Sequence, residues 1–172
     1  MLVASIGGST LSPPAAPKPV QRPAIHLSFH SESGPSLSVD VDVWLCALDL
    51  AVAHGWVPAG TAEPRDGAAR AKNDPWSYDR GSGRRVAGED ARELARCLEK
   101  ALPKVPEDVV PMQGRPFGSD HTRELVQRAS GGAAVAEEEA LAAAEILSGP
   151  PKAEALSLID FLRQGAFSIS AE

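Results

Sequence analysis

Three short segments of the chain alternate between apolar and polar residues, the two-residue period of a half-buried β-strand. The apolar positions are Ile25, Leu27 and Phe29 in the first segment, Leu37, Val39 and Val41 in the second, and Phe167 and Ile169 in the third. A turn-like composition, Ser-Glu-Ser-Gly-Pro, separates the first two. The pattern therefore predicts a small, mostly antiparallel sheet. It leaves the strand pairing open, with the first and last strands as candidate neighbours.

A further hairpin is predicted around a glycine-rich turn. Trp76 and Tyr78 face Arg84 and Val86 across the segment Asp-Arg-Gly-Ser-Gly at 79–83. Glycine at such a turn supplies the positive φ that tight hairpin connections require. We therefore expect strands on both sides of residues 79–83.

Helical periodicity separates two kinds of helix. Residues 42–54 are apolar around most of the helical circumference, which is typical of a central helix packed on at least two sides. Residues 88–101 instead have one clean apolar stripe opposite a charged face. Further helices are predicted at 119–130, at 133–147 and from Pro150 to just before Gly165. The expected fold is α+β, with three to four helices packed on the sheet.

The chain divides into a tail and one domain. Residues 1–23 are rich in Pro, Ala and Ser, a composition that cannot bury enough apolar surface to offset the entropy of ordering. We expect this segment to be a disordered tail. Residues 24–172 are then a single α+β domain, long enough to bury a core without disulfides.

The formal net charge of −6 argues against nucleic acid or an anionic membrane surface as a partner. No apolar run approaches the roughly 20 residues needed to cross a bilayer, and the N-terminus lacks the basic lead of a signal peptide. A cytoplasmic location is therefore expected. Cys46 and Cys97 form no disulfide framework or zinc motif. We predict no metal and no cofactor.

Candidate catalytic groupings have simpler explanations. His26 and His30 have the spacing of a helical metal pair, but on a strand four residues span roughly 13 Å, too far for two ligands of one zinc ion. Ser119, Asp120 and His121 are adjacent along a helix start, which does not make a triad converge. An enzyme or small-ligand site would have to be assembled from distant residues, such as His30, Asp40, Asp49, His54, Tyr78 and His121.

A net basic stretch between residues 64 and 85 is the segment most suggestive of a binding surface in this acidic chain. Arg, Trp and Tyr are enriched at interface hot spots. Function also tends to lie on loops held by a rigid scaffold. The alternative is a solvated loop with its aromatic pair packed on the core. The candidate partner-binding residues are Arg65, Arg70, Trp76, Tyr78, Arg80, Arg84 and Arg85.

Several phrases of the sequence resemble small acidic proteins of high-GC bacteria that have no known activity. They are WLCALDLAVAHGWVPAGT at 44–61, the run Val-x-x-Glu-Asp-Ala at 86–91, Leu-Glu-Lys-Ala-Leu-Pro at 98–103, and FLRQGAF at 161–167. Together they cover about half of the expected domain. The resemblance implies no activity and assigns no functional residue.

Without a recognisable catalytic grouping, the leading hypothesis is a non-enzymatic interaction module that binds another protein, in the manner of immunity or adaptor proteins. The alternative hypothesis is a small-ligand-binding protein, or an enzyme whose site combines distant residues.

Overall fold

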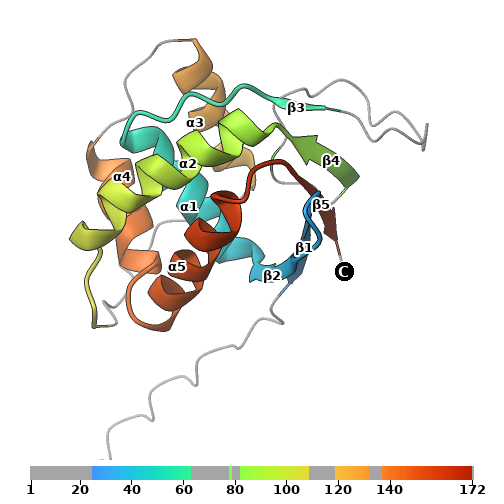
Figure 1. Cartoon of the computed structure of the whole chain (residues 1–172). Coiled ribbons are helices and arrows are strands. Elements are labelled where there is room, and N and C mark those ends of the chain that lie inside the picture. The colour runs from blue at the N-terminus through green and yellow to red at the C-terminus, as the bar shows by residue number, and fades with distance from the viewer. Residues whose placement is uncertain (1–24, 63–77, 79–81, 109–118, 132–136, 172) are drawn as a thin grey trace, which may run out of the picture.

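A computed structural model describes residues 25–62, 78, 82–108, 119–131 and 137–171 (Figure 1). The predicted tail at 1–23 lies outside these residues. In chain order the elements are β1 (His26–Ser31), β2 (Ser36–Asp40), α1 (Val41–Ala53), β3 (Thr61–Ala62), β4 (Ser82–Val86), α2 (Gly88–Ala101), the short 3-10 helix η1 (Leu102–Lys104), α3 (Ser119–Ser130), α4 (Glu137–Ile146), α5 (Pro150–Leu162) and β5 (Phe167–Ala171). Five α-helices thus stand in the described ranges, one at each segment for which the sequence predicts a helix.

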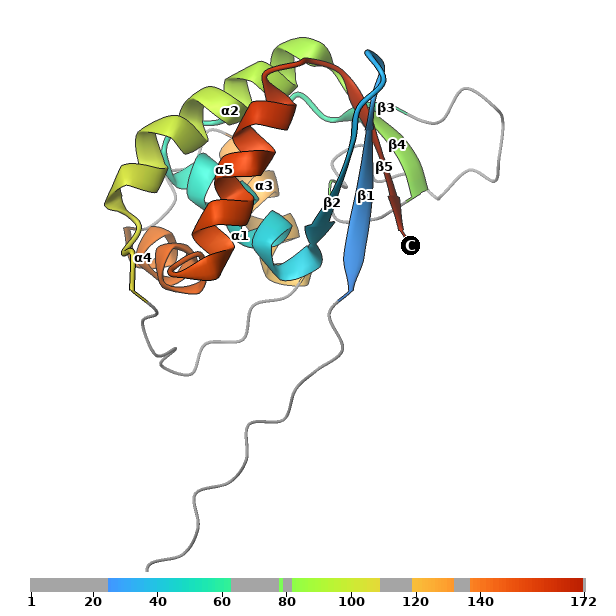
Figure 2. The same cartoon turned by 60° about the horizontal axis from the view of Figure 1, so that its bottom comes forward.

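The sheet has five strands in the order β2-β1-β5-β4-β3, and all neighbouring strands are antiparallel. The helices lie on one face of it (Figure 2). The first and last strands are neighbours, with Phe29 opposite Ile169. Both side chains are fully buried on the helix side. The α+β fold class and the antiparallel sheet are confirmed.

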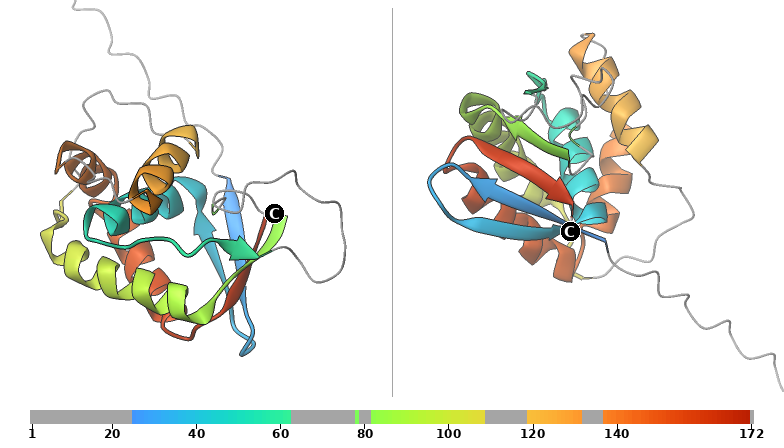
Figure 3. Two further views of the ribbon diagram at one scale, coloured as in Figure 1. Left: turned by 90° about the horizontal axis from the view of Figure 1, so that it is seen from above. Right: turned by 90° about the vertical axis from the view of Figure 1, so that its right-hand side faces the viewer.

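The predicted hairpin around residues 79–83 is wrong. Strand β4 pairs with β5 on one side, where Val86 lies opposite Phe167, and with β3 on the other, where Val86 lies opposite Thr61. Val86 is therefore paired on both sides, which leaves no place beside it for the strand expected before the turn, and Tyr78 belongs to none of the described strands. Figure 3 shows β4 between the red β5 and the short β3. Local alternation indicated the strand correctly, but not its partners.

Helix α1 is the centre of the helical layer, as predicted. Every residue from Val43 to Val52 is buried, and α1 contacts α2, α3, α4 and α5. The Asp40 carboxylate caps its first turn by accepting the backbone N–H of Asp42 at 2.8 Å. The chain leaves the helix at Gly55, whose φ of 94° suits a residue without a Cβ.

The remaining helices follow their apolar patterns. Helix α2 has the predicted bounds and buries its apolar stripe together with Asp90. Helix α3 also has the predicted bounds. Helix α4 is Glu137–Ile146, and residues 133–136 of the predicted helix lie outside the described ones. No helix in the described ranges is long and apolar enough to cross a membrane.

Four aromatic rings join the sheet to α1 and α5. The ring centroid of Phe29 lies 4.8 Å from that of Trp44 and 5.3 Å from that of Phe167, and Phe161 lies 5.6 Å from Phe167. Edge-on and tilted pairs at these distances stabilise a core beyond simple burial. Few aromatic residues are present, and these four are concentrated where the two layers meet.

Candidate functional site

The structure leaves one accessible described residue of the predicted partner-binding set. Arg65, Arg70, Trp76 and Arg80 lie outside the described residues. Arg85 is half-buried on β4 and forms an ion pair with Glu32 at 2.5 Å. The two remaining candidates, Tyr78 and Arg84, are both buried.

Tyr78 is a core residue, so the interpretation of it as an exposed anchor is corrected. Its side chain is 2% exposed and lies edge-on to Trp56, with centroids 5.2 Å apart. Its hydroxyl donates to Asp90 Oδ2 at 2.6 Å and accepts the backbone N–H of Gly60 at 2.8 Å. Its backbone carbonyl accepts the indole N–H of Trp44 at 2.7 Å. These contacts hold residue 78 between α1 and α2.

Arg84 is likewise buried, at 4% exposure, because its side chain lies on the helix side of β4. It donates to Thr61 Oγ1 at 3.3 Å across the β3–β4 pair. Arg84 therefore cannot contribute an exposed charge to a partner, contrary to the sequence-based prediction.

Asp90 completes the network that the sequence analysis missed. Its Oδ1 accepts the indole N–H of Trp56 at 2.9 Å and the backbone N–H of Ala59 at 3.3 Å. Burial raises the pKa of the Asp90 carboxyl, and the hydrogen bonds from Tyr78, Trp56 and Ala59 lower it in part. Burial and then the Asp90 charge raise the pKa of the Tyr78 phenol. With its acceptors filled by protein donors, this network is structural.

The distant polar residues proposed as an alternative active site do not converge. Asp40 caps the start of α1 and His54 ends it, which separates them by about 20 Å at 1.5 Å per residue. His30 lies on β1, where its ring nitrogens contact Ser36 Oγ at 3.0 Å and Ser170 Oγ at 3.1 Å. The His121 side chain is outside the described ones. These polar groups occupy separate parts of the fold.

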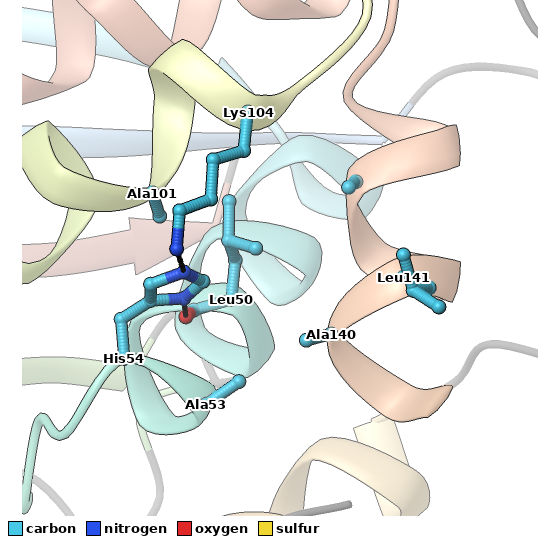
Figure 4. Close-up of a pocket in the computed structure, with 8 residues that line it drawn as sticks. Leu50, Ala53, His54, Ala101, Lys104, Ala140 and Leu141 are labelled. Atoms are coloured by element: carbon cyan, nitrogen blue, oxygen red, sulfur yellow. Dashed lines mark hydrogen bonds between the residues drawn. The ribbon is translucent and has the colours of Figure 1, made fainter. Parts of the chain in front are cut away.

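A pocket of about 360 Å³ lies instead between the ends of α1 and α2 and the side of α4 (Figure 4). Leu50 and Ala101 form its floor, since both are almost fully buried, and Leu141 at its rim is 61% exposed. Ligand sites of about 300–1,000 Å³ with apolar walls and a few polar groups are common in proteins. The lining residues are Leu50, Ala53, His54, Ala101, Lys104, Ala140, Leu141 and Ala144.

His54 and Lys104 supply the polar side of the pocket. The His54 Nδ1 lies 2.9 Å from the Leu50 carbonyl oxygen, which can only accept, so Nδ1 carries the proton. Lys104 Nζ can only donate, so Nε2 of the same ring accepts from it at 3.4 Å. The C-cap of α1 and the 3-10 turn after α2 therefore place an oriented imidazole and an ammonium side by side (Figure 4).

Two other hollows of similar size lack this combination. One, of about 390 Å³, is lined by the polar residues Glu124, Gln127 and Arg128 of α3. The other, of about 400 Å³, contains charges that are already paired, since Lys152 contacts Glu107 and Arg163 contacts Asp160. The pocket at His54 is the better candidate because it combines an apolar floor with the Lys104 ammonium, which has N–H donors left for a ligand.

The fold and the pocket define a two-layer α+β protein with a small, mostly apolar pocket on its helical side. Comparison with protein-family models, with curated proteins and with solved structures returns no match to this chain. Within the described ranges, no three histidine, cysteine, aspartate or glutamate side chains are grouped so that they could hold a metal ion.

Sequence reasoning included His54 among the scattered polar candidates but missed Lys104 and the pocket itself. The available signal was the position of both residues near the end of a predicted helix. His54 is the last residue of the helix predicted at 42–54, and Lys104 follows Pro103, just after the helix predicted at 88–101. Basic residues are favoured at helix C-terminal ends. The sequence does not indicate that these two helix ends meet.

Proposed function

We propose that this chain is a non-enzymatic binding protein for a small, partly apolar molecule held in the pocket at His54. The observation that carries the proposal is the composition of the pocket: six of the eight described lining residues are Ala or Leu, and the polar groups stand together on one side. Such a site would bury the apolar part of a ligand and orient its polar end.

The same lining supports binding rather than catalysis. The lining residues that the structure describes include no Ser, Thr, Cys, Asp or Glu. Hydroxyl, thiol and carboxylate groups are the usual nucleophiles and acid–base pairs of hydrolytic sites. The Nε2 of His54 also faces the Lys104 ammonium rather than a hydroxyl or thiol that it could activate.

The hypothesis of a protein partner stays a prediction. Of the predicted partner-binding residues that the structure describes, Arg85 remains accessible, and its charge is offset by Glu32. A small ligand therefore has the stronger support, because the groups that would bind it are described and lie together.

The proposal can be tested with hexanamide, a neutral molecule with a short apolar chain. The full-length chain, labelled at its alanine methyl groups, is titrated while its methyl spectrum is recorded. We expect saturable shifts for the four pocket alanines and none for Ala153, which is exposed on α5. The pocket alanines are Ala53, Ala101, Ala140 and Ala144.

A blocking variant makes the test specific. Ala140→Leu adds three carbon atoms at the wall of the pocket and should abolish the saturable shifts, whereas the matched control Ala153→Leu should not. Both variants should retain the far-ultraviolet dichroism of the parent. The absence of saturable shifts in the parent chain, or equal loss in both variants, would reject this pocket as a binding site.

A further inference from the structure

Lys104 differs from three other described cations in the company of its charged group. Arg85, Lys152 and Arg163 each lie within 2.9 Å of a carboxylate oxygen. Lys104 Nζ contacts Nε2 of His54, and among the described residues no carboxylate is within ion-pair distance of it. The described residues around the pocket thus orient this positive charge but do not neutralise it.

The imidazole fixes the direction of this charge. Because the Leu50 carbonyl holds His54 Nδ1–H, the lone pair of Nε2 points at Lys104. An ammonium has three N–H donors, so one can be shared with His54 while two stay available to a ligand. The lysine stem crosses the pocket wall near Ala101, which places the ammonium beside the apolar floor (Figure 4).

We infer that the ligand of this pocket is a monocarboxylate with a short aliphatic chain, an inference that rests on the proposed function. Its carboxylate accepts from Lys104 Nζ, and its chain covers Leu50 and Ala101 between α1, α2 and α4. Hydrogen bonds between charged groups are about twice as strong as neutral ones. A single cation matches the single charge of a carboxylate, and the apolar lining matches the chain.

An amine is the competing ligand. Helices α1 and α2 both end at the pocket, and helix C-terminal ends carry partial negative charge. That charge favours a cation, but Lys104 already supplies one. A second cation beside the ammonium would be repelled, so the structure favours the anion.

The experiment compares hexanoate, hexanamide and hexylamine, which share a chain and differ in charge. Each is titrated into the full chain near neutral pH at low salt, with the alanine methyl shifts as the readout. We expect hexanoate to bind about tenfold more tightly than hexanamide, which corresponds to about 1.4 kcal/mol. Added salt should reduce this advantage, because the contribution comes from an exposed charge.

Lys104→Met keeps most of the side-chain length and removes the charge. It should reduce the affinity for hexanoate to that for hexanamide and leave hexanamide binding unchanged. The matched control Lys100→Met removes an exposed charge of α2 that does not line the pocket and should leave the preference for hexanoate intact. Dichroism spectra check that both variants fold.

The outcomes separate this inference from the proposed function. Equal affinity for hexanoate and hexanamide, tighter binding of hexylamine, or loss of the preference in Lys100→Met would overturn the carboxylate assignment, while pocket binding would stand. If none of the three molecules shifts the pocket alanines, both the proposed function and the carboxylate assignment fail. A preference for hexanoate that disappears only in Lys104→Met supports both.

Discussion

Replacing Tyr78 with Phe removes one oxygen atom from the middle of the buried network and nothing else. In the native structure that hydroxyl accepts the Gly60 N–H at 2.8 Å and donates to the Asp90 carboxylate at 2.6 Å. The phenylalanine ring can keep its edge-on contact with Trp56, so the lost area of buried apolar surface is close to zero. The perturbation is therefore almost purely one of hydrogen bonding.

The magnitude follows from the two lost contacts. A hydrogen bond to a charged group contributes about 1.5–3 kcal/mol to folding, and the Gly60 N–H without its acceptor costs about a further 1 kcal/mol. The expected loss in the free energy of unfolding is thus about 2.5–4 kcal/mol for Tyr78→Phe. As a control, Ser157→Ala removes an exposed hydroxyl bonded to the Ala153 carbonyl and should cost less than about 0.5 kcal/mol.

Urea unfolding followed by tryptophan fluorescence measures both values, and an unchanged m-value would show that the comparison is between similar unfolded states. If Tyr78→Phe costs no more than Ser157→Ala, the hydroxyl does not stabilise the fold and the network has been misinterpreted. A residue that served as an exposed anchor for a partner would give that result, with the loss appearing in binding instead.

Two further predictions concern the helices. Leu50→Asp should unfold the domain because it buries a charge at a site that is 2% exposed. Glu93→Ala, which removes a surface ion pair with Arg96, should cost less than about 1 kcal/mol by the same urea assay; similar effects for the two would contradict the central position of α1. Because burial raises the folded-state pKa of Asp90 above the unfolded value near 3.9, its protonation favours folding at low pH, and this contribution is lost as pH rises through the folded-state pKa. The stability of the parent chain minus that of Asp90→Asn should accordingly decrease from about pH 3 to neutral pH; an increase over that range would show that the hydrogen bonds outweigh burial.

The local pattern of apolar residues was sufficient to predict a helix or strand wherever the burial of that element followed from its own sequence. Residues 42–54 are apolar around most of the helix, which predicted a helix enclosed by others. Residues 88–101 have a single apolar stripe, which predicted a helix with an exposed charged face. Both predictions are confirmed, because the spacing of apolar residues along a helix shows which of its faces are buried. The strands at 167–171 and 26–31 were found from alternation for the same reason.

Tyr78 shows where that reasoning stops. Its neighbours in the sequence are charged or small, so the local composition is that of a surface loop. Its contacts come from Gly60 and Trp56, about twenty residues earlier, and from Asp90, twelve residues later. Neither helical nor strand periodicity relates residues that are this far apart in the sequence. The sequence could therefore show an aromatic side chain in need of a partner, but not whether that partner was the core of the same chain.

The pocket is a consequence of the weakest helical pattern in the chain. The segment 133–147 has many alanines and no strong apolar stripe, which made it the hardest helix to place by periodicity. A Leu-rich stripe on α4 would have packed against Leu50 and filled the space between α1 and α4. The small side chains of Ala140 and Ala144 leave that space open beside His54 and Lys104. The feature that weakens the signal for a helix in the sequence is thus the one that makes room for a ligand in the structure.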